Sequence, residues 1–124
     1  MKIVYYIVLA LGFLISPARA ELQIDVNGAM REPMPIAFPQ MSGSGSAADY
    51  GERIREVVIA DLERSGLFRI IPEDSYIQKF SSIDELPRFG DWKAINAVSL
   101  VQSAISEIDT DNLRVEFRLW DVFA

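Results

Sequence analysis

Alternation of apolar and polar residues predicts two half-buried strands, at residues 22–26 and 113–120. Successive side chains of a strand point to opposite faces of a sheet, so a period of two is typical of a strand with one face in the core. Residues 109–112, which are rich in Asp and Asn, predict a turn, and residues 97–108 before it are apolar at their start. We therefore expect residues 97–108 and 113–120 to form an antiparallel hairpin.

Residues 47–65 carry the pattern of a helix, because their apolar residues recur at spacings of three and four. Ser46 followed by Asp49 is typical of a helix N-cap. Gly66 suits the left-handed residue that ends a helix. The expected buried stripe consists of Ile54, Val57, Val58 and Leu62.

The remaining elements are shorter. Residues 33–39 are apolar but contain three prolines, so we expect an edge or terminal strand of about four residues. Residues 67–71 predict a short strand and residues 75–80 a helical turn. A second helix is expected over residues 92–96, capped by Asp91. The predicted fold class is α/β, a mixed β-sheet of about five strands with two helices packed on one face.

The first twenty residues have the layout of a secretory signal peptide. Lys2 makes the start basic, residues 3–15 are almost entirely apolar, and Ala18 and Ala20 are the small residues of a cleavage site. The apolar run is too short to span a bilayer, which takes about 20 residues. We expect residues 1–20 to be removed, which leaves an exported domain at residues 21–124.

The composition of the chain mainly excludes classes of functional site. The chain contains no His and no Cys, which excludes Ser-His-Asp and Cys-His nucleophilic sites, imidazole or thiolate metal sites, and disulfides. With 12 Lys and Arg against 18 Asp and Glu, its net charge is −6. Nucleic-acid binding draws most of its affinity from clustered cations, so we do not expect it here. A length of 124 residues fits one domain.

Two segments resemble ligand sites in part. Residues 42–46 are a Ser-Gly stretch ahead of a helix, but they hold no Lys or Arg, so we interpret them as a mobile linker and not as a phosphate site. A calcium loop that began at Asp109 would need Gly at position 114 and Glu at position 120. The chain has Arg114 and Trp120 there, so residues 109–112 are better explained as a turn.

Two tryptophans are candidates for packing or contact. Trp92 is expected to anchor the core beneath the short helix, whereas Trp120 lies on the polar face of its strand and is a candidate interface residue. With Val122 and Phe123, Trp120 is also expected to form an exposed apolar patch, which would favour self-association.

Five segments resemble the amino-terminal domain of the TolB family in its alphaproteobacterial form. The most specific are ADLERSGLF at residues 60–68 and FRLWDVF at residues 117–123. The others are LQIDV at residues 22–26, PIAFP at residues 35–39 and FGDWKAINA at residues 89–97. Residues 101–106 depart from the family, where a glycine-containing strand is expected. The family continues into a six-bladed β-propeller, so a sequence that stops at Ala124 suggests a fragment or a truncated copy.

The resemblance implies a non-catalytic periplasmic component of the Tol-Pal system, which needs no cofactor. That system links the inner membrane, the peptidoglycan and the outer membrane, and it supports envelope invagination during cell division. In the family the propeller binds the lipoprotein Pal and is a target of some colicins, so without a propeller Pal is not an expected partner. The mature amino-terminal segment of the family engages TolA. Carried over to this sequence, that segment comprises Glu21, Leu22, Gln23, Ile24, Asp25, Val26 and Asn27.

Other interpretations stay open. A terminal strand can add to the sheet edge of a partner, but the pattern of residues 22–26 alone favours a strand that completes its own sheet. The chain could also be a stand-alone periplasmic domain that binds a small ligand or uses paired carboxylates as a hydrolase. A non-functional truncated remnant is the third alternative.

Overall fold

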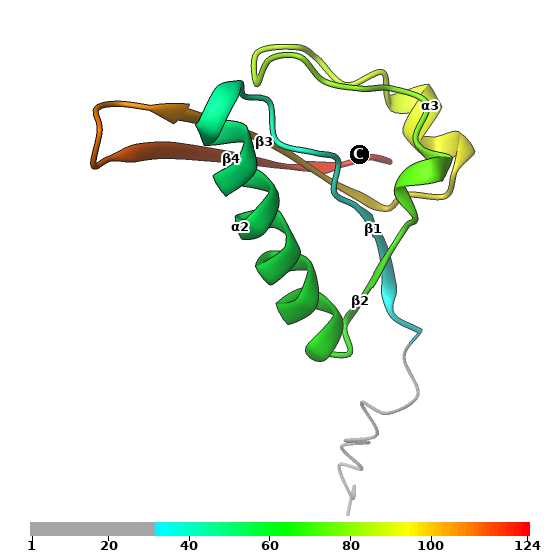
Figure 1. The fold of residues 1–124 in the computed structure, drawn as a ribbon. Coiled ribbons are helices and arrows are strands. Elements are labelled where there is room, and N and C mark those ends of the chain that lie inside the picture. The colour runs from blue at the N-terminus through cyan, green and yellow to red at the C-terminus, as the bar shows by residue number, and fades with distance from the viewer. Residues whose placement is uncertain (1–31) are drawn as a thin grey trace, which may run out of the picture.

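The computed structural model describes residues 32–124 (Figure 1), so the expected signal peptide, the strand at residues 22–26 and the segment at residues 21–27 lie outside the described residues. The described elements, in chain order, are β1 (Met34–Ala37), α2 (Gly45–Arg64), β2 (Phe68–Ile70), the 3₁₀ turn η2 (Glu73–Ser75), α3 (Phe89–Ala94), β3 (Ser99–Glu107) and β4 (Leu113–Asp121). Four strands form one mixed sheet in the order β2-β1-β3-β4. The predicted α/β class is confirmed, with four described strands where about five were expected.

β1 lies inside the sheet, parallel to both β2 and β3. Its predicted length is confirmed, but the edge position predicted from its prolines is wrong. The Met34 amide donates to the Leu67 carbonyl on the β2 side, at 2.8 Å. On the other side the carbonyl of Pro35 accepts from the Val98 amide at 3.0 Å, and pairing with β3 begins only at Ile36. The amide that Pro35 lacks therefore falls just before that ladder starts.

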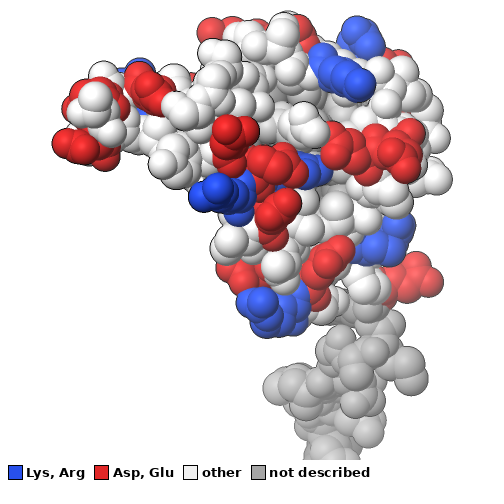
Figure 2. Space-filling view, viewed as in Figure 1, with Lys and Arg blue, Asp and Glu red and all other residues white. Residues whose placement is uncertain are grey.

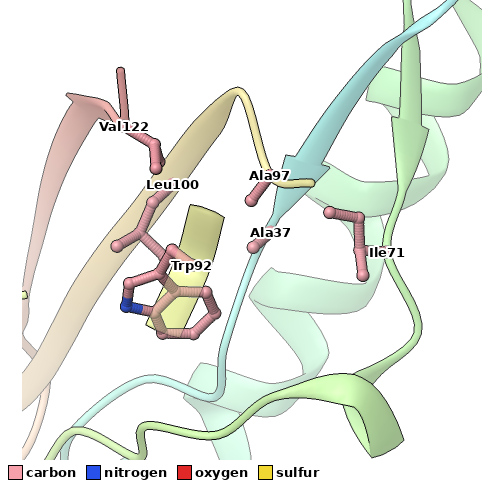
Figure 3. Close-up of a cluster of buried hydrophobic side chains, with 6 residues drawn as sticks. All are labelled: Ala37, Ile71, Trp92, Ala97, Leu100 and Val122. Atoms are coloured by element: carbon pink, nitrogen blue, oxygen red, sulfur yellow. The ribbon is translucent and has the colours of Figure 1, made fainter. Parts of the chain in front are cut away.

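Two hydrophobic clusters lie on opposite faces of the sheet, because alternate residues of β3 point to opposite faces. Leu100 packs in one cluster with Trp92 of α3, and Ile105 packs in the other with Ala47 of α2. The helices therefore cover opposite faces, whereas the sequence predicted both on one face. The α3 cluster, drawn in Figure 3, comprises Ala37, Ile71, Trp92, Ala97, Leu100 and Val122. The α2 cluster comprises Phe38, Met41, Ala47 and Ile105.

The buried line of α2 differs from the predicted stripe. Its buried residues are Ala47, Gly51 and Arg55, spaced by four. A Cβ on Gly51 would lie 2.9 Å from Ile105 Cγ2, so the glycine lets the helix approach β3. Ile54, Val58 and Leu62 pack beside the cluster as predicted, but Val57 is 62% exposed. The predicted stripe was chosen from apolar residues alone, so it missed Gly51 and Arg55 and lay to one side of the line that is actually buried.

The ends of α2 show one wrong prediction and one confirmed. The helix begins at Gly45 after Ser44, and no side chain caps it. Ser46, the predicted cap, lies within the first turn and donates its hydroxyl to the Glu107 carboxylate. Gly66 follows the helix with a φ of 73°, as its left-handed role requires.

The smaller elements are displaced by a few residues. α3 begins at Phe89, so Asp91 lies in its first turn and does not cap it. The expected turn at residues 75–80 is instead η2, at residues 73–75. The β3–β4 hairpin is antiparallel over its whole length, as predicted. None of the described helices is long and apolar enough to cross a membrane.

Candidate interaction site

The predicted partner-binding segment, residues 21–27, lies outside the described residues. What the structure describes is the start of β1, some residues further along the chain. There an open hollow is lined by Glu32, Pro33, Met34, Pro35, Arg69 and Val98. Met34 is 41% exposed in it. The described domain therefore presents a partly apolar surface near the point at which the predicted segment joins it.

Arg55 is a buried charged residue that connects α2 to the rest of the domain through hydrogen bonds and ion pairs. Its Nε donates to the Phe38 carbonyl at 2.8 Å, just beyond β1, and its guanidinium lies 5.8 Å from the centre of the Phe38 ring. Its Nη1 donates to Glu52 at 3.0 Å, and Nη2 lies 3.7 Å from Glu73 of η2. Arg55 thus connects α2 to η2 and to the segment that follows β1, a role that the helical pattern did not indicate.

Tyr76 bonds to two backbone groups in the same region. Its hydroxyl accepts from the Phe38 amide at 2.9 Å and donates to the Ile71 carbonyl at 2.8 Å. Burial raises the pKa of Tyr76 above its ordinary value, so the hydroxyl keeps its proton at neutral pH. Both polar capacities are used for structure, which does not favour an acid–base role.

Two buried glutamines fix the long connection between η2 and α3. Gln78 Oε1 accepts from the Trp92 indole at 3.0 Å. Gln102 Oε1 accepts from the Trp120 indole at 3.0 Å, and its amide donates to the Glu85 carbonyl at 2.7 Å. Trp92 is fully buried, which confirms it as a core anchor.

Trp120, the candidate interface residue, is half-buried within the domain. Its ring packs edge-on against Phe89 at 5.7 Å and lies against the α3 cluster. Val122 is also buried, at 1% exposure, so the expected patch of Trp120, Val122 and Phe123 is wrong for its first two members. The exposed apolar residues near the end of the chain are Phe117, Leu119 and Phe123.

A hollow of about 640 Å³ lies at the start of α2. Its lining is rich in serine and includes Glu107 and Glu116 but no Lys or Arg, so it does not suit an anion. The Ser-Gly stretch beside it is not a free linker, because the Ser42 amide donates to the Ser103 carbonyl at 2.9 Å. A Cβ on Gly43 would come within 2.8 Å of Ile105. The prediction of a mobile linker is therefore wrong at these two residues.

Acidic side chains gather along the outward side of α2 and at the end of the β3–β4 hairpin (Figure 2). At the hairpin turn Asp109 accepts from the Asp111 amide at 2.9 Å and from the Asn112 side chain, which confirms the turn interpretation. The hydrogen bond from the Asp111 amide lowers the pKa of Asp109. Over residues 32–124 no group of three or more acidic residues could hold a metal ion.

Comparison with known proteins decides the family. Residues 22–124 match the family described as the TolB amino-terminal domain. The chain belongs to this family. It is 50% identical over 109 residues to the Tol-Pal system protein TolB of Paramagnetospirillum magneticum. The matched region covers 86% of this chain and 24% of that protein. The chain thus spans about a quarter of the length of this TolB relative.

The solved structures agree on the fold. The crystal structure of TolB from Acinetobacter baumannii matches with a TM-score of 0.55 at 22% identity, over 75% of this chain and 21% of that one. At this identity the likeness concerns the fold alone. Together the comparisons confirm the resemblance to the TolB amino-terminal domain that the sequence motifs indicated.

Proposed function

We propose that this chain is a non-catalytic component of the Tol-Pal system that works by binding another protein. Its membership of the TolB amino-terminal domain family is the observation that carries the proposal. In this proposal residues 1–20 direct export and are cleaved, and residues 21–124 act in the periplasm. There the domain supports outer-membrane integrity and envelope invagination during division.

The mature amino-terminal segment is the proposed partner-binding element, and TolA is the proposed partner. The segment alternates Leu22, Ile24 and Val26 with polar residues, the pattern of a strand that buries one face. Such a segment can add to the sheet edge of another protein, where backbone hydrogen bonds give affinity and alternate side chains give specificity. Pal binding, which the resemblance assigns to the propeller, is not proposed for these residues.

The described domain supports a carrier role for that segment. The buried side chains of Arg55, Gln78 and Gln102 and the half-buried hydroxyl of Tyr76 bond to backbone groups of the domain, which is typical of structural and not catalytic groups. These bonds fix the far end of β1, because Arg55 and Tyr76 both bond to Phe38, which directly follows the strand.

A titration with the periplasmic carboxy-terminal domain of TolA tests the proposal. We expect saturable binding by the processed chain, followed by calorimetry, and its loss when residues 21–27 are deleted. Ile24→Asp should weaken binding by about tenfold or more, because a buried aliphatic side chain contributes about 1.5–3 kcal/mol. Gln23→Asp adds the same charge on the opposite face and should change affinity by less than about threefold.

The outcomes separate the alternatives. A folded intact chain that does not bind TolA contradicts the proposed partner. Equal loss with Ile24→Asp and Gln23→Asp contradicts recognition through one face of a strand. A stand-alone ligand-binding or hydrolytic domain would keep its binding or turnover after deletion of residues 21–27.

A further inference from the structure

Residues 81–88, here called the strap, lie against the sheet without pairing with it. The connection between η2 and α3 runs toward the start of α2 and then returns to α3 (Figure 1), and the strap is its far part. Among residues 32–124, no main-chain group of the strap bonds to the main chain of a strand. Segments with few main-chain bonds and few buried apolar contacts are the ones that open locally in a folded protein.

Two side chains of the sheet hold the middle of the strap. The Gln102 side-chain amide in β3 donates to the Ser82 carbonyl at 3.2 Å and to the Glu85 carbonyl at 2.7 Å. Arg118 of β4, directly opposite Gln102, donates to the Ile83 carbonyl at 2.6 Å. The closed position of the strap therefore depends on the ends of two neighbouring side chains.

Gln78, which precedes the strap in the chain, holds its last residues. The side-chain amide of Gln78 donates to the Leu86 carbonyl at 3.2 Å, and Oε1 accepts from the Arg88 amide at 2.7 Å. Gln78 is itself buried, so it holds the strap from the side of the core. The strap is thus held at one end by Gln78 and in the middle by Gln102 and Arg118.

The strap has little apolar packing of its own. Pro87 is its one buried residue, and Leu86 is 72% exposed. The ion pair between Arg118 and Asp84 is exposed on both sides, so it contributes little. The two glutamines therefore supply most of what keeps the strap closed.

Aromatic rings fix the chain on either side of the strap. Phe80, just before it, stacks on Trp92 with ring centres 5.9 Å apart. Phe89, just after it, packs edge-on against Trp120 at 5.7 Å. The same two tryptophans donate their indole N–H groups to the two glutamines, at 3.0 Å each. Fixed ends and oriented glutamines let the strap return to one closed position after it opens, because little side-chain freedom is then lost.

We propose that the strap is a lid, which opens as a unit while the rest of the described domain stays folded. Opening exchanges the glutamine bonds for bonds to water, so no polar group of the latch is left buried without a partner. It uncovers Gln102 and Trp120, and it removes the wall that Ser81, Ser82 and Ile83 contribute to the hollow at the start of α2. The open state therefore presents a surface that the closed state hides.

Hydrogen exchange of the whole unsubstituted chain tests the opening. The Arg88 amide bonds to Gln78 at the strap, and the Val98 amide bonds to the Pro35 carbonyl inside the sheet. Relative to its intrinsic rate, the Arg88 amide should exchange about a hundredfold faster than the Val98 amide. Its exchange should also depend less on urea, because opening the strap exposes less surface than unfolding does.

Equal protection and equal urea dependence of the two amides would overturn the proposal, since the strap would then open only when the whole domain unfolds. An Arg88 amide without any protection would overturn it as well, because a lid needs a closed state.

Thiol labelling gives an independent measurement at a side chain. The chain has no Cys, so Pro87→Cys places a single thiol in the strap and Ser103→Cys places one in the buried part of β3. We expect the thiol at position 87 to react about a hundredfold faster than the thiol at position 103, and more slowly than in the urea-unfolded chain. Equal rates at the two positions would contradict a separate opening of the strap.

Two further substitutions distinguish the latch from general destabilisation. Gln102→Leu should speed labelling at position 87 about tenfold, because it removes two bonds to the strap. Ile105→Ala is the control, since it removes a buried side chain from the α2 cluster on the opposite face of the sheet. It should speed labelling at position 103 by about thirtyfold or more and leave position 87 within about twofold.

An unchanged rate at position 87 in Gln102→Leu would contradict the role of the glutamine, and an equal increase at both positions in Ile105→Ala would contradict a separate opening. These measurements use the chain without a partner. A failure of TolA binding would therefore leave the lid untouched, and the two proposals fail separately.

Discussion

β3 and β4 have the same length and pair residue for residue, yet they lie in opposite surroundings. β3 contains four buried residues, namely Leu100, Gln102, Ser103 and Ile105, whereas β4 contains none. Among residues 32–124, β3 has a neighbouring strand on each side and a hydrophobic cluster on each face. β4 pairs there with β3 alone, and it projects with the hairpin past α2 (Figure 1). The position of each strand in the sheet, and not its sequence pattern, therefore determines how many of its residues are buried.

The strand with the more regular alternation is the exposed one. β4 alternates apolar residues with Arg114, Glu116 and Arg118, which gives the clearest period of two in the chain. β3 holds few charges and has apolar residues on both faces at its start. Because charges are excluded from an interior strand, a less regular pattern marks the better-buried strand.

The largest test of this contrast compares two leucines of one hairpin. Leu100 is fully buried in β3, and Leu119 is 72% exposed in β4. Leu100→Ala should lower the free energy of unfolding by about 2–5 kcal/mol, because it leaves a cavity in the α3 cluster. Leu119→Ala should lower it by less than about 0.5 kcal/mol.

Urea unfolding followed by Trp fluorescence measures both changes. It should be done at a concentration where the chain is monomeric, so that association does not contribute. Equal losses for the two variants would show that β4 is as well packed as β3.

A second pair of side chains lies directly opposite across the hairpin, Gln102 in β3 and Arg118 in β4. Gln102→Leu removes the acceptor of the Trp120 indole and the donor to Glu85, so we expect a loss of about 1–3 kcal/mol. Arg118→Leu removes an exposed pair with Asp84 and should cost at most about 1 kcal/mol.

Hydrogen exchange adds a local measurement to these two stabilities. Gln102→Leu should raise the exchange of amides in residues 82–88, because the side-chain amide of Gln102 donates to the carbonyls of Ser82 and Glu85. If Arg118→Leu raises exchange there as much, the exposed arginine holds the loop equally well.

Much of this fold could be predicted from the sequence, because its elements depend on local signals. The hairpin, the long helix, Gly66 and Trp92 all rest on period, turn chemistry or size, and all were confirmed. The missed features depend on tertiary contacts. Gly51 lies where α2 approaches β3 so closely that a side chain would collide with Ile105. Arg55 can be buried because the Phe38 carbonyl accepts a hydrogen bond from its guanidinium.

The candidate site was less predictable than the fold. Trp120 and Val122 were expected on a surface, but their strand end turns into the α3 cluster, where the Val122 amide bonds to Val98. Phe117 and Leu119 belong to the apolar side of the half-buried strand predicted at residues 113–120, yet both are exposed. Alternation identifies which residues share a face, but it does not show whether another element covers that face.

The smallest test concerns the turn that joins the two strands. The Asp111 amide, and then the Asn112 side chain, hold the pKa of Asp109 below its ordinary value. A carboxyl whose pKa is lower in the folded state contributes stability above its unfolded pKa, and loses it as pH falls through the folded pKa. Asn112→Ala should therefore move the pKa of Asp109 upward, as followed by carboxyl NMR between pH 2 and 6, with little change at neutral pH. Asp111→Ala keeps the backbone donor and should leave most of the lowering in place, because the main cause is an amide and not a side chain. An equal upward shift in both variants would contradict this account of the turn.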